Sequence, residues 1–216
     1  MKPLRRRAAD LATELAVGDR ALLLSGTPCD EQCFRDADLS ARTVASLRMR
    51  ACLLERCNLS GVTVKSVKLR DVRLVGCDLS NSVLMGCEAT RVELIRCRLT
   101  GLRAVECRWE SVLLDDCEAR YAQFTSGVLK QCEIREGSFT EADFGAADLS
   151  HTVFTRVALR LAEMTGARLT GADLRGADLE GVRIRAEDVR GAIVTPAQAL
   201  AWAHLDRKST RLNSSH

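Results

Sequence analysis

The run Gly171-Ala-Asp-Leu-Arg-Gly-Ala-Asp-Leu-Glu180 contains a five-residue unit that recurs through most of the chain. An apolar residue returns at every fifth position from Leu39 to Val194, which gives 32 consecutive pentads. A second series two residues earlier holds small or β-branched side chains, for example Val72 and Ala172. A period of five fits neither a helix nor a flat strand, so the chain must turn once in each pentad. A fixed internal period predicts a stacked solenoid.

The pentad divides into a short extended piece and a corner. Two inward residues separated by one outward residue form the extended piece, and the remaining two residues form the corner. Glycine often stands two places after the central apolar residue, and glycine tolerates the positive φ that many tight turns require. The glycines at this corner position are Gly61, Gly76, Gly86, Gly101, Gly166, Gly171, Gly176, Gly181 and Gly191.

The repeats resemble those of a known family. The runs Ala37-Asp-Leu-Ser40, Cys77-Asp-Leu-Ser80 and 171–180 resemble the A(D/N)LXX signature of the pentapeptide-repeat proteins. The resemblance implies an all-β fold, a right-handed quadrilateral β-helix with four pentads per coil and therefore about eight coils. With neighbouring strands ~4.8 Å apart, eight coils form a rod roughly 38 Å long.

In this geometry, residues 20 apart stack on one wall. Cys87 is expected above Cys107, and Val72 and Val92 are expected on another wall. Arg42 and Glu187 occupy inward positions in the terminal coils, and we expect both to turn outward because burial of a charge is costly. The expected structural core comprises Leu59, Leu79, Leu99, Phe124, Phe144, Leu149, Cys57, Cys77, Cys97 and Cys117.

The repeats divide the chain into an N-terminal cap and lead-in over 1–35, a β-helix over 36–195 and C-terminal segments. Apolar residues at helical spacing, such as Leu11 and Leu15, predict a helix over 5–17 that covers the open end of the first coil. Leu22 to Leu24 are expected to be extended, and Phe34 continues the repeat phase backwards by one unit.

A second capping helix is predicted over 196–206. Thr195 is a suitable N-cap, Pro196 suits the first helical position, and Gln198 completes a capping box. This end resembles that of the fluoroquinolone-resistance branch of the family, which implies a homodimer through the terminal helix. Residues 207–216 resemble translated adapter sequence, so we expect a non-native tail. The possible dimer cap consists of Leu200, Trp202 and Leu205.

The chain holds ten cysteines, and no apolar segment follows its basic first residues. This combination predicts reduced thiols and a cytoplasmic location. No stretch is long and apolar enough to predict a membrane span. Eight cysteines occupy the small inward position, where cysteine packs as a small hydrophobe. Cys29 and Cys33 lie outside the regular repeats, and a zinc site there is a weaker alternative.

No arrangement of residues predicts catalysis. The three histidines, His151, His204 and His216, are scattered, and no Walker loop, dinucleotide fingerprint or nucleophile with its base is present. The frequent aspartates recur because Asp suits the outward position of the pentad. A rod with a solid core also lacks the cleft that enzymes use. We expect a non-enzyme without cofactor or metal.

Charge separates the candidate functions. Residues 36–195 hold 23 basic and 23 acidic side chains, so the rod lacks the acidic surface that mimicry of duplex DNA requires. We expect a protein-protein interaction surface with an unknown partner. The alternative is a DNA gyrase or topoisomerase modulator that gives quinolone or toxin tolerance. Nucleic-acid binding is a weaker possibility, and a merely solvated face also remains open. The possible partner patch consists of Arg48, Arg50, Lys68, Arg70 and Arg91.

Overall fold

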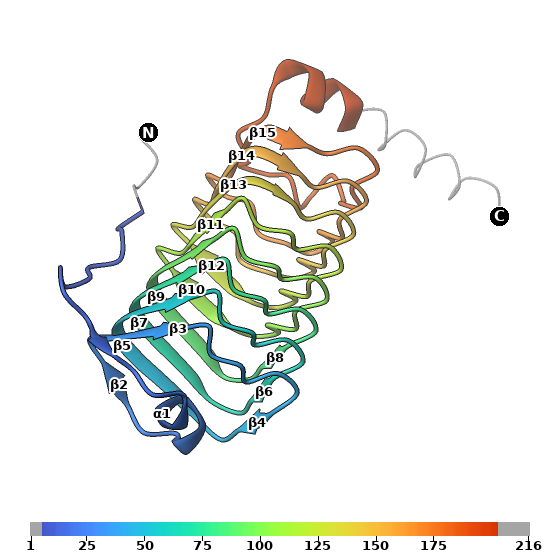
Figure 1. Ribbon diagram of the computed structural model, residues 1–216. Coiled ribbons are helices and arrows are strands. Elements are labelled where there is room, and N and C mark those ends of the chain that lie inside the picture. The colour runs from blue at the N-terminus through green and yellow to red at the C-terminus, as the bar shows by residue number, and fades with distance from the viewer. Residues whose placement is uncertain (1–5, 203–216) are drawn as a thin grey trace.

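The computed structural model describes residues 6–202, which form a parallel β-helix of about eight coils (Figure 1). Each coil advances by 20 residues, as the pairing of Leu54 with Leu74 and of Leu74 with Leu94 shows. Twenty residues hold four pentads, so the quadrilateral coil expected from the family resemblance is confirmed.

Most strands belong to one 12-stranded sheet in which coils stack in sequence order. A 3-stranded sheet forms a second wall in the first coils. The large sheet contains β1 (Ala16–Val17), β2 (Cys29–Asp30), β3 (Gln32–Arg35), β5 (Leu47–Glu55), β7 (Val67–Val75), β9 (Cys87–Ile95), β10 (Arg108–Glu110), β11 (Leu113–Asp115), β12 (Val128–Lys130), β13 (Glu133–Ser138), β14 (Val153–Ala158) and β15 (Asp173–Asp178). The small sheet contains β4 (Thr43–Val44), β6 (Thr63–Val64) and β8 (Val83–Leu84).

Some strands continue through a corner and are longer than one pentad predicts. Strands β5, β7 and β9 each hold nine residues. Their middle residues Ala51, Asp71 and Arg91 have φ of 51°, 55° and 52°. A single left-handed residue therefore turns the strand from one wall to the next, even without glycine.

The corner glycines follow the prediction with one exception. Eight of the nine have positive φ, whereas Gly176 does not. Gly176 lies inside β15 and pairs with Thr155 of β14, and the register between the two strands shifts on both sides of this pair. A Cβ at Gly176 would lie only 2.9 Å from the carbonyl oxygen of Phe154. This glycine permits a close approach of two backbones, and the prediction of a left-handed corner there was wrong.

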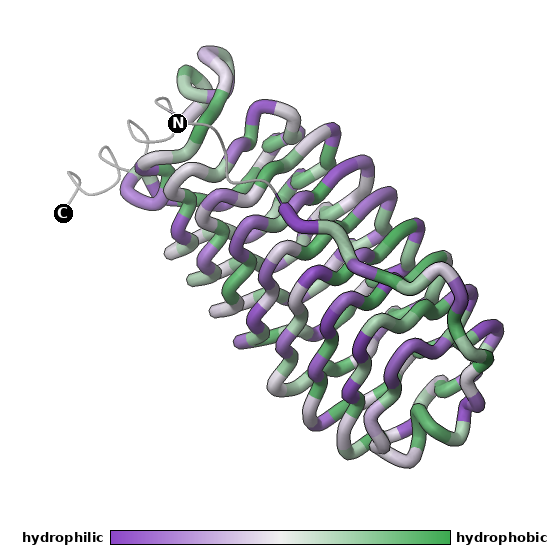
Figure 2. Tube along the Cα trace, turned by 90° about the vertical axis from the view of Figure 1, so that its left-hand side faces the viewer, coloured by the Kyte–Doolittle hydropathy of each residue, from purple (hydrophilic) through white to green (hydrophobic). Residues whose placement is uncertain are grey.

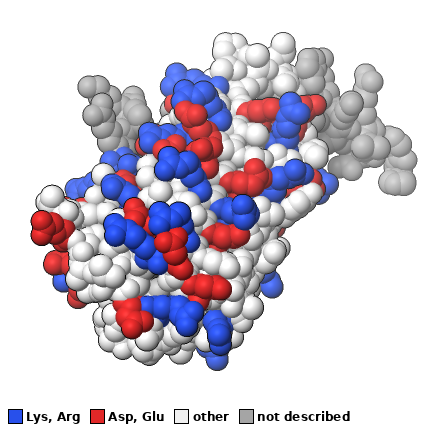
Figure 3. Space-filling model, viewed as in Figure 1, with Lys and Arg blue, Asp and Glu red and all other residues white. Residues whose placement is uncertain are grey.

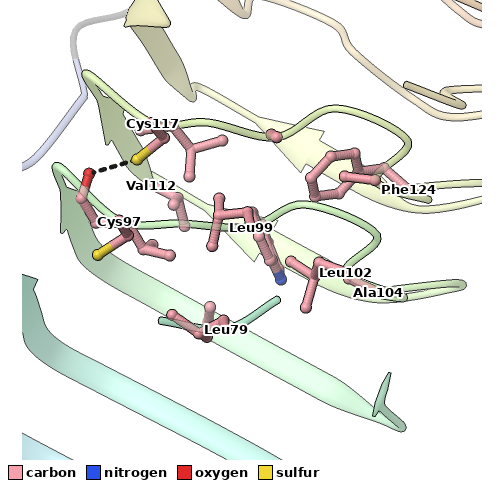
Figure 4. Close-up of a cluster of buried hydrophobic side chains, with 14 of the residues drawn as sticks. Leu79, Cys97, Leu99, Leu102, Ala104, Val112, Cys117 and Phe124 are labelled. Atoms are coloured by element: carbon pink, nitrogen blue, oxygen red, sulfur yellow. Dashed lines mark hydrogen bonds between the residues drawn. The ribbon is translucent and has the colours of Figure 1, made fainter. Parts of the chain in front are cut away.

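The interior is filled by the two inward residues of each pentad. Phe124 and Phe144 stack with ring centroids 5.1 Å apart, and Trp109 meets Phe124 edge to face. Figure 4 shows Cys97 and Cys117 on neighbouring coils beside Leu99, with the hydrogen bond of the Cys117 thiol. All ten residues expected in the structural core are buried: Leu59, Leu79, Leu99, Phe124, Phe144, Leu149, Cys57, Cys77, Cys97 and Cys117.

The N-terminal cap differs from the predicted helix over 5–17. In the described part of that range, residues 6–15 are not helical and β1 follows them. The helix is α1 (Arg20–Ser25), which begins at the N-cap Asp19 and ends at Gly26. Leu23 of α1 is buried in the core cluster, so α1 covers the first coil. The extended conformation expected for Leu22 to Leu24 was therefore also wrong.

The terminal coils hold the two charged inward positions, and both Arg42 and Glu187 are exposed as expected. Phe34 is buried and pairs with Leu54, so it continues the repeat backwards. At the far end, residues 196–202 are helical. No helix within residues 6–202 has the length and hydropathy needed to cross a membrane.

Candidate interaction surface

Charged side chains of opposite sign lie one coil apart on the outer walls. Figure 3 shows basic and acidic groups side by side over this face. Because the outward positions recur every 20 residues, a charge stands directly above its partner in the next coil. The pairs at this spacing are Asp30–Arg50, Arg35–Glu55, Asp36–Arg56, Lys68–Glu88, Asp71–Arg91, Arg73–Glu93, Asp78–Arg98, Asp115–Arg135, Glu136–Arg156, Asp148–Arg168 and Arg160–Glu180.

One hollow on this surface carries an excess of positive charge. Its volume is about 300 Å³, and strands β5 and β7 supply most of its lining. We call it the basic hollow and define it by four cations, two rim carboxylates and two apolar floor residues. The cations are Arg48, Arg50, Lys68 and Arg70, the rim carboxylates belong to Asp30 and Glu88, and the floor residues are Met49 and Leu69.

The rim carboxylates neutralise only part of this charge. Arg50 Nε lies 3.2 Å from Asp30 Oδ1, and this hydrogen bond raises the pKa of Arg50. Lys68 Nζ lies 3.5 Å from Glu88 Oε2. Arg48 donates instead to a backbone carbonyl, that of Gly26, at 3.4 Å. Arg70 Nε lies 3.8 Å from Asp71 Oδ2, but Arg91 already holds that carboxylate. Arg48 and the exposed Arg70 therefore supply the charge that the rim carboxylates do not balance.

Arg91 does not line the basic hollow. Its guanidinium forms a bidentate pair with Asp71 at the neighbouring corner, with distances of 2.6 and 2.5 Å. Burial acts to raise the pKa of Asp71, but hydrogen bonds from Arg91 and from the Asp10 amide outweigh it and lower that pKa. Of the five predicted patch residues, the structure brings four together and places Arg91 elsewhere.

The cysteines are free thiols in the core. All ten are buried, including Cys29 and Cys33. Burial raises the pKa of the Cys132 thiol to about 12, so it remains protonated. A buried thiol of this kind is a poor nucleophile. Within residues 6–202, no group of three or more His, Cys, Asp or Glu side chains is arranged to hold a metal ion.

The C-terminal end presents an apolar hollow of about 600 Å³ between the last coil and the helix over 196–202. Thr195 and Gln198 form the reciprocal hydrogen bonds of a capping box, at 2.8 and 3.2 Å. Trp202 packs against the core, whereas Leu200 is 62% exposed. Leu205, the third predicted dimer-cap residue, lies outside the described residues.

Sequence reasoning missed the role of the outward aspartates. The Asp78 side chain accepts a hydrogen bond from the Ser80 amide at 2.9 Å, and Asp148 accepts one from the Ser150 amide at 3.1 Å. Each carboxylate therefore bridges to the residue two places later, as in an Asx turn. The signal was available in the sequence, since Asp or Asn precedes the central leucine in many pentads.

The fold and surface define a class of protein: a parallel β-helix with a solid core, whose outer walls are available for contact. Models of the pentapeptide repeat region match residues 47–124 and 67–144, and a model of eight copies of the pentapeptide repeat matches residues 142–181. The chain belongs to the pentapeptide repeat family. No curated protein sequence matches the chain.

Several solved structures are similar to this chain. HetL, involved in heterocyst differentiation regulation in the cyanobacterium Nostoc, is 20% identical with a TM-score of 0.33; the match covers 78% of this chain and 87% of HetL. The plasmid-mediated fluoroquinolone resistance protein QnrB1 is 21% identical with a TM-score of 0.37; the match covers 88% of this chain and 96% of QnrB1. Likeness at this level concerns the fold and identifies no partner.

Proposed function

We propose that this pentapeptide-repeat β-helix acts without catalysis, by presenting the basic hollow to an acidic segment of a partner protein. The observation that carries the proposal is the unbalanced cation set. Four cations face two carboxylates around a hollow of about 300 Å³. The side chains of Arg50, Lys68 and Arg70 are 59%, 58% and 65% exposed, so a partner has access to them.

The size of the positive region favours a peptide over a nucleic acid. The cations belong to two neighbouring coils, which are ~4.8 Å apart. Further along the same wall, the basic residues Arg108 and Lys130 alternate with Glu110 and Asp148, so no continuous positive track forms. Duplex DNA carries charge along its whole length and gains affinity from many phosphate contacts. A few acidic side chains on an apolar floor of Met49 and Leu69 match the basic hollow better.

Charge reversal tests the proposal. The variant Arg48→Glu/Arg70→Glu removes the unbalanced cations, and Arg103→Glu/Arg183→Glu changes two exposed arginines on another wall. The probe is a fluorescein-labelled glutamate-rich peptide, titrated by fluorescence anisotropy at two salt concentrations. We expect at least about tenfold weaker binding for the hollow variant, equivalent to 1.4 kcal/mol, and little change for the control. Equal losses in both variants would refute a localised site.

A second candidate is a modulator of a type II topoisomerase. It rests on the resemblance of the C-terminal segment to the fluoroquinolone-resistance branch. The balanced charge of residues 36–195 argues against simple mimicry of duplex DNA. A gyrase supercoiling assay with a quinolone separates the candidates. Protection of gyrase at stoichiometric amounts supports the second candidate, and unchanged drug sensitivity at excess protein removes it.

Two further proposals concern assembly and location. Leu200 and the apolar hollow beside Trp202 suit a homodimer through the C-terminal helix. Light scattering of wild type and Leu200→Glu tests this, and a wild-type monomer at high concentration would contradict it. The ten free thiols suit a reducing compartment such as the cytoplasm. Fractionation of cells that express the tagged chain tests the location.

A further inference from the structure

The N-terminal segment crosses the outside of the large sheet instead of capping the rod. Figure 2 shows it running over several coils, outside the solenoid. We call residues 6–17 the N-terminal strap. Its end near α1 is fixed by pairing of β1 with β3 and by the Gly18 amide, which donates to the Cys33 carbonyl at 2.8 Å.

The other end of the strap is held by carboxylates of distant coils. The Asp10 amide donates to Asp71 Oδ1 at 3.1 Å, and the Ala9 amide donates to Glu93 Oε1 at 3.3 Å. Arg6 Nη1 also donates to Glu93 Oε1, at 3.1 Å. A chain lying here is thus recognised by its backbone amides and by one arginine.

The wall that receives the strap is preorganised. Beneath the strap, Asp71 and Glu93 are only 7% and 4% exposed, although both stand on the outside of the solenoid. Arg91 holds Asp71, and Arg73 holds Glu93 with an Nε to Oε2 distance of 2.8 Å. Carboxylates fixed in this way accept hydrogen bonds with little loss of side-chain entropy.

The strap fills this site incompletely. A hollow of about 340 Å³ remains between the wall and strap residues such as Leu11 and Leu15. Arg6 Nε is buried without a hydrogen-bond partner, and it lies 3.6 Å from Glu133 Oε2. None of residues 6–17 is fully buried. An occupant that fills the hollow and donates a hydrogen bond to Glu133 would make contacts that the strap lacks.

We propose that this wall is a binding site for an extended, arginine-bearing peptide of a partner protein, and that the N-terminal strap occupies it in the free chain. Arginine suits the site because a planar guanidinium reaches two carboxylates at once, here Glu93 and Glu133. Apolar side chains beside the arginine would enter the hollow against Leu53. This site lies on a different wall from the basic hollow, and the two meet only at the corner, where Arg70 Nε lies 3.8 Å from Asp71 Oδ2.

The experiment opens the strap in the full chain. Arg6→Glu/Ala9→Pro reverses the charge of the side chain that faces Glu93, and it removes the Ala9 amide that donates to Glu93. Arg7→Glu/Ala8→Pro is the matched control, because both positions are exposed and their amides donate to no carboxylate within residues 6–202. The probe is a fluorescein-labelled synthetic peptide with the sequence of residues 4–17, Leu-Arg-Arg-Arg-Ala-Ala-Asp-Leu-Ala-Thr-Glu-Leu-Ala-Val. Hydrogen exchange reports opening of the strap, and circular dichroism reports the fold.

We expect the opened variant to bind the peptide at least tenfold more tightly than wild type, while the control binds as wild type does. Adding Glu93→Gln to the opened variant, or replacing the peptide's Arg6 with alanine, should abolish the gain. An opened, folded variant that binds no better than wild type would overturn the proposal. A strap that stays protected from exchange in that variant would also overturn it, because the hydrogen bonds of Arg6 and Ala9 to Glu93 would then not be what holds the strap.

Discussion

The small inward position of the pentad holds side chains that donate a hydrogen bond into the preceding coil. The Cys57 thiol donates to the Phe34 carbonyl, and the Ser82 hydroxyl donates to the Leu59 carbonyl at 2.6 Å. Because the donor is satisfied, cysteine, serine and threonine enter the core without an unpaired polar group. This hydrogen bond allows Ser82 to be fully buried.

Adjacent residues of one pentad should respond differently to the same substitution. Leu79→Lys places a charge in the core, where Leu79 is 5% exposed, and should destabilise the fold by at least about 3 kcal/mol. Asp78→Lys should lose about 1 kcal/mol, because Asp78 caps the Ser80 amide and pairs with Arg98 at 2.7 Å. Urea denaturation measures both. Similar losses in the two variants would contradict the inward and outward assignment.

Acid should weaken the attachment of the N-terminal strap. Burial acts to raise the pKa values of Asp71 and Glu93, but hydrogen bonds hold them below their ordinary values of 3.8 and 4.5. The donors are Arg91 and Arg73 on the wall, and the Asp10 amide, the Arg6 side chain and the Ala9 amide of the strap. A carboxyl whose pKa is lower in the folded state stabilises it above the unfolded pKa, and this contribution is lost as pH falls through the folded pKa. Proteolysis of the strap should accelerate below about pH 4.

A double variant provides the control for this pH dependence. Asp71→Asn/Glu93→Gln removes both titrating groups, so its strap should be cleaved at a rate that changes little between pH 6 and pH 3, apart from the protease's own pH dependence. An acid-stable protease allows the comparison. Equal acceleration in wild type and the double variant would show that other groups cause the effect.

Neighbouring strands are joined by backbone ladders and by the ion pairs that stand one coil apart. Asp115 of β11 and Arg135 of β13 are one such pair, with Oδ2 and Nη2 separated by 2.9 Å. The Arg135 side chain is 40% exposed, so solvent screens the attraction. Each pair contributes little, but the pairs favour the 20-residue register over a slipped one.

Reversing the order of one pair tests this role. Arg135→Asp places two carboxylates one coil apart and should destabilise the fold by about 0.5–1 kcal/mol. Asp115→Arg/Arg135→Asp should recover the part of that loss that involves position 115, because the charges of this pair are exchanged, while the 3.7 Å contact of Arg135 with Glu133 remains lost. Thermal unfolding of the four proteins in a double-mutant cycle gives the coupling. If the cycle gives no coupling free energy between positions 115 and 135, packing of the core alone sets the register.

The five-residue repeat predicted the coils, but the sequence before the repeats predicted the N-terminal helix and strand less well. Residues 5–17 show helical spacing of apolar residues, yet the partners Asp71 and Glu93 lie far along the chain, so no local pattern reveals the strap. The short helix α1 had local signals that the prediction overlooked. Asp19 accepts a hydrogen bond from the Ala21 amide, and Gly26 has a φ of 73°.

The predicted partner patch also shows that contacts between distant residues are hard to predict from the sequence. Positions 20 apart put Arg48 beside Lys68 and Arg50 beside Arg70, so the repeat alone suffices to group these cations. Arg91 falls on a corner residue with positive φ, where its side chain meets Asp71 of the preceding coil. The pentad position of Arg91 was visible in the sequence, but its pairing and the hollow's depth depend on side-chain packing.

The whole rod is a stack in which each coil contacts its neighbours, so its ends and its middle can open independently. At the C-terminal end, Gln198 ties the capping helix to the last coil. Its Nε2 donates to the carbonyls of Leu174 and Ala177 at 2.9 and 3.1 Å. The capping helix therefore supplies donors to a coil that has no further coil above it.

Gln198→Ala should loosen only this end of the rod. Loss of two hydrogen bonds to backbone carbonyls should increase hydrogen exchange over about 173–194, while exchange in the middle coils remains as in wild type. Leu200→Ala is the matched control, since Leu200 is exposed on the same helix. Exchange that rises throughout the rod would contradict independent opening of its end.

The central functional claim is that a localised cation set on the outer wall receives an acidic partner. Arginine side-chain Nε–Hε signals, recorded by NMR during titration with the glutamate-rich peptide, test it most directly. We expect the signals of Arg48, Arg50 and Arg70 to shift together and to saturate with one affinity, while those of Arg103 and Arg183 stay unchanged. Shifts spread evenly over the arginines, or confined to another wall, would contradict it.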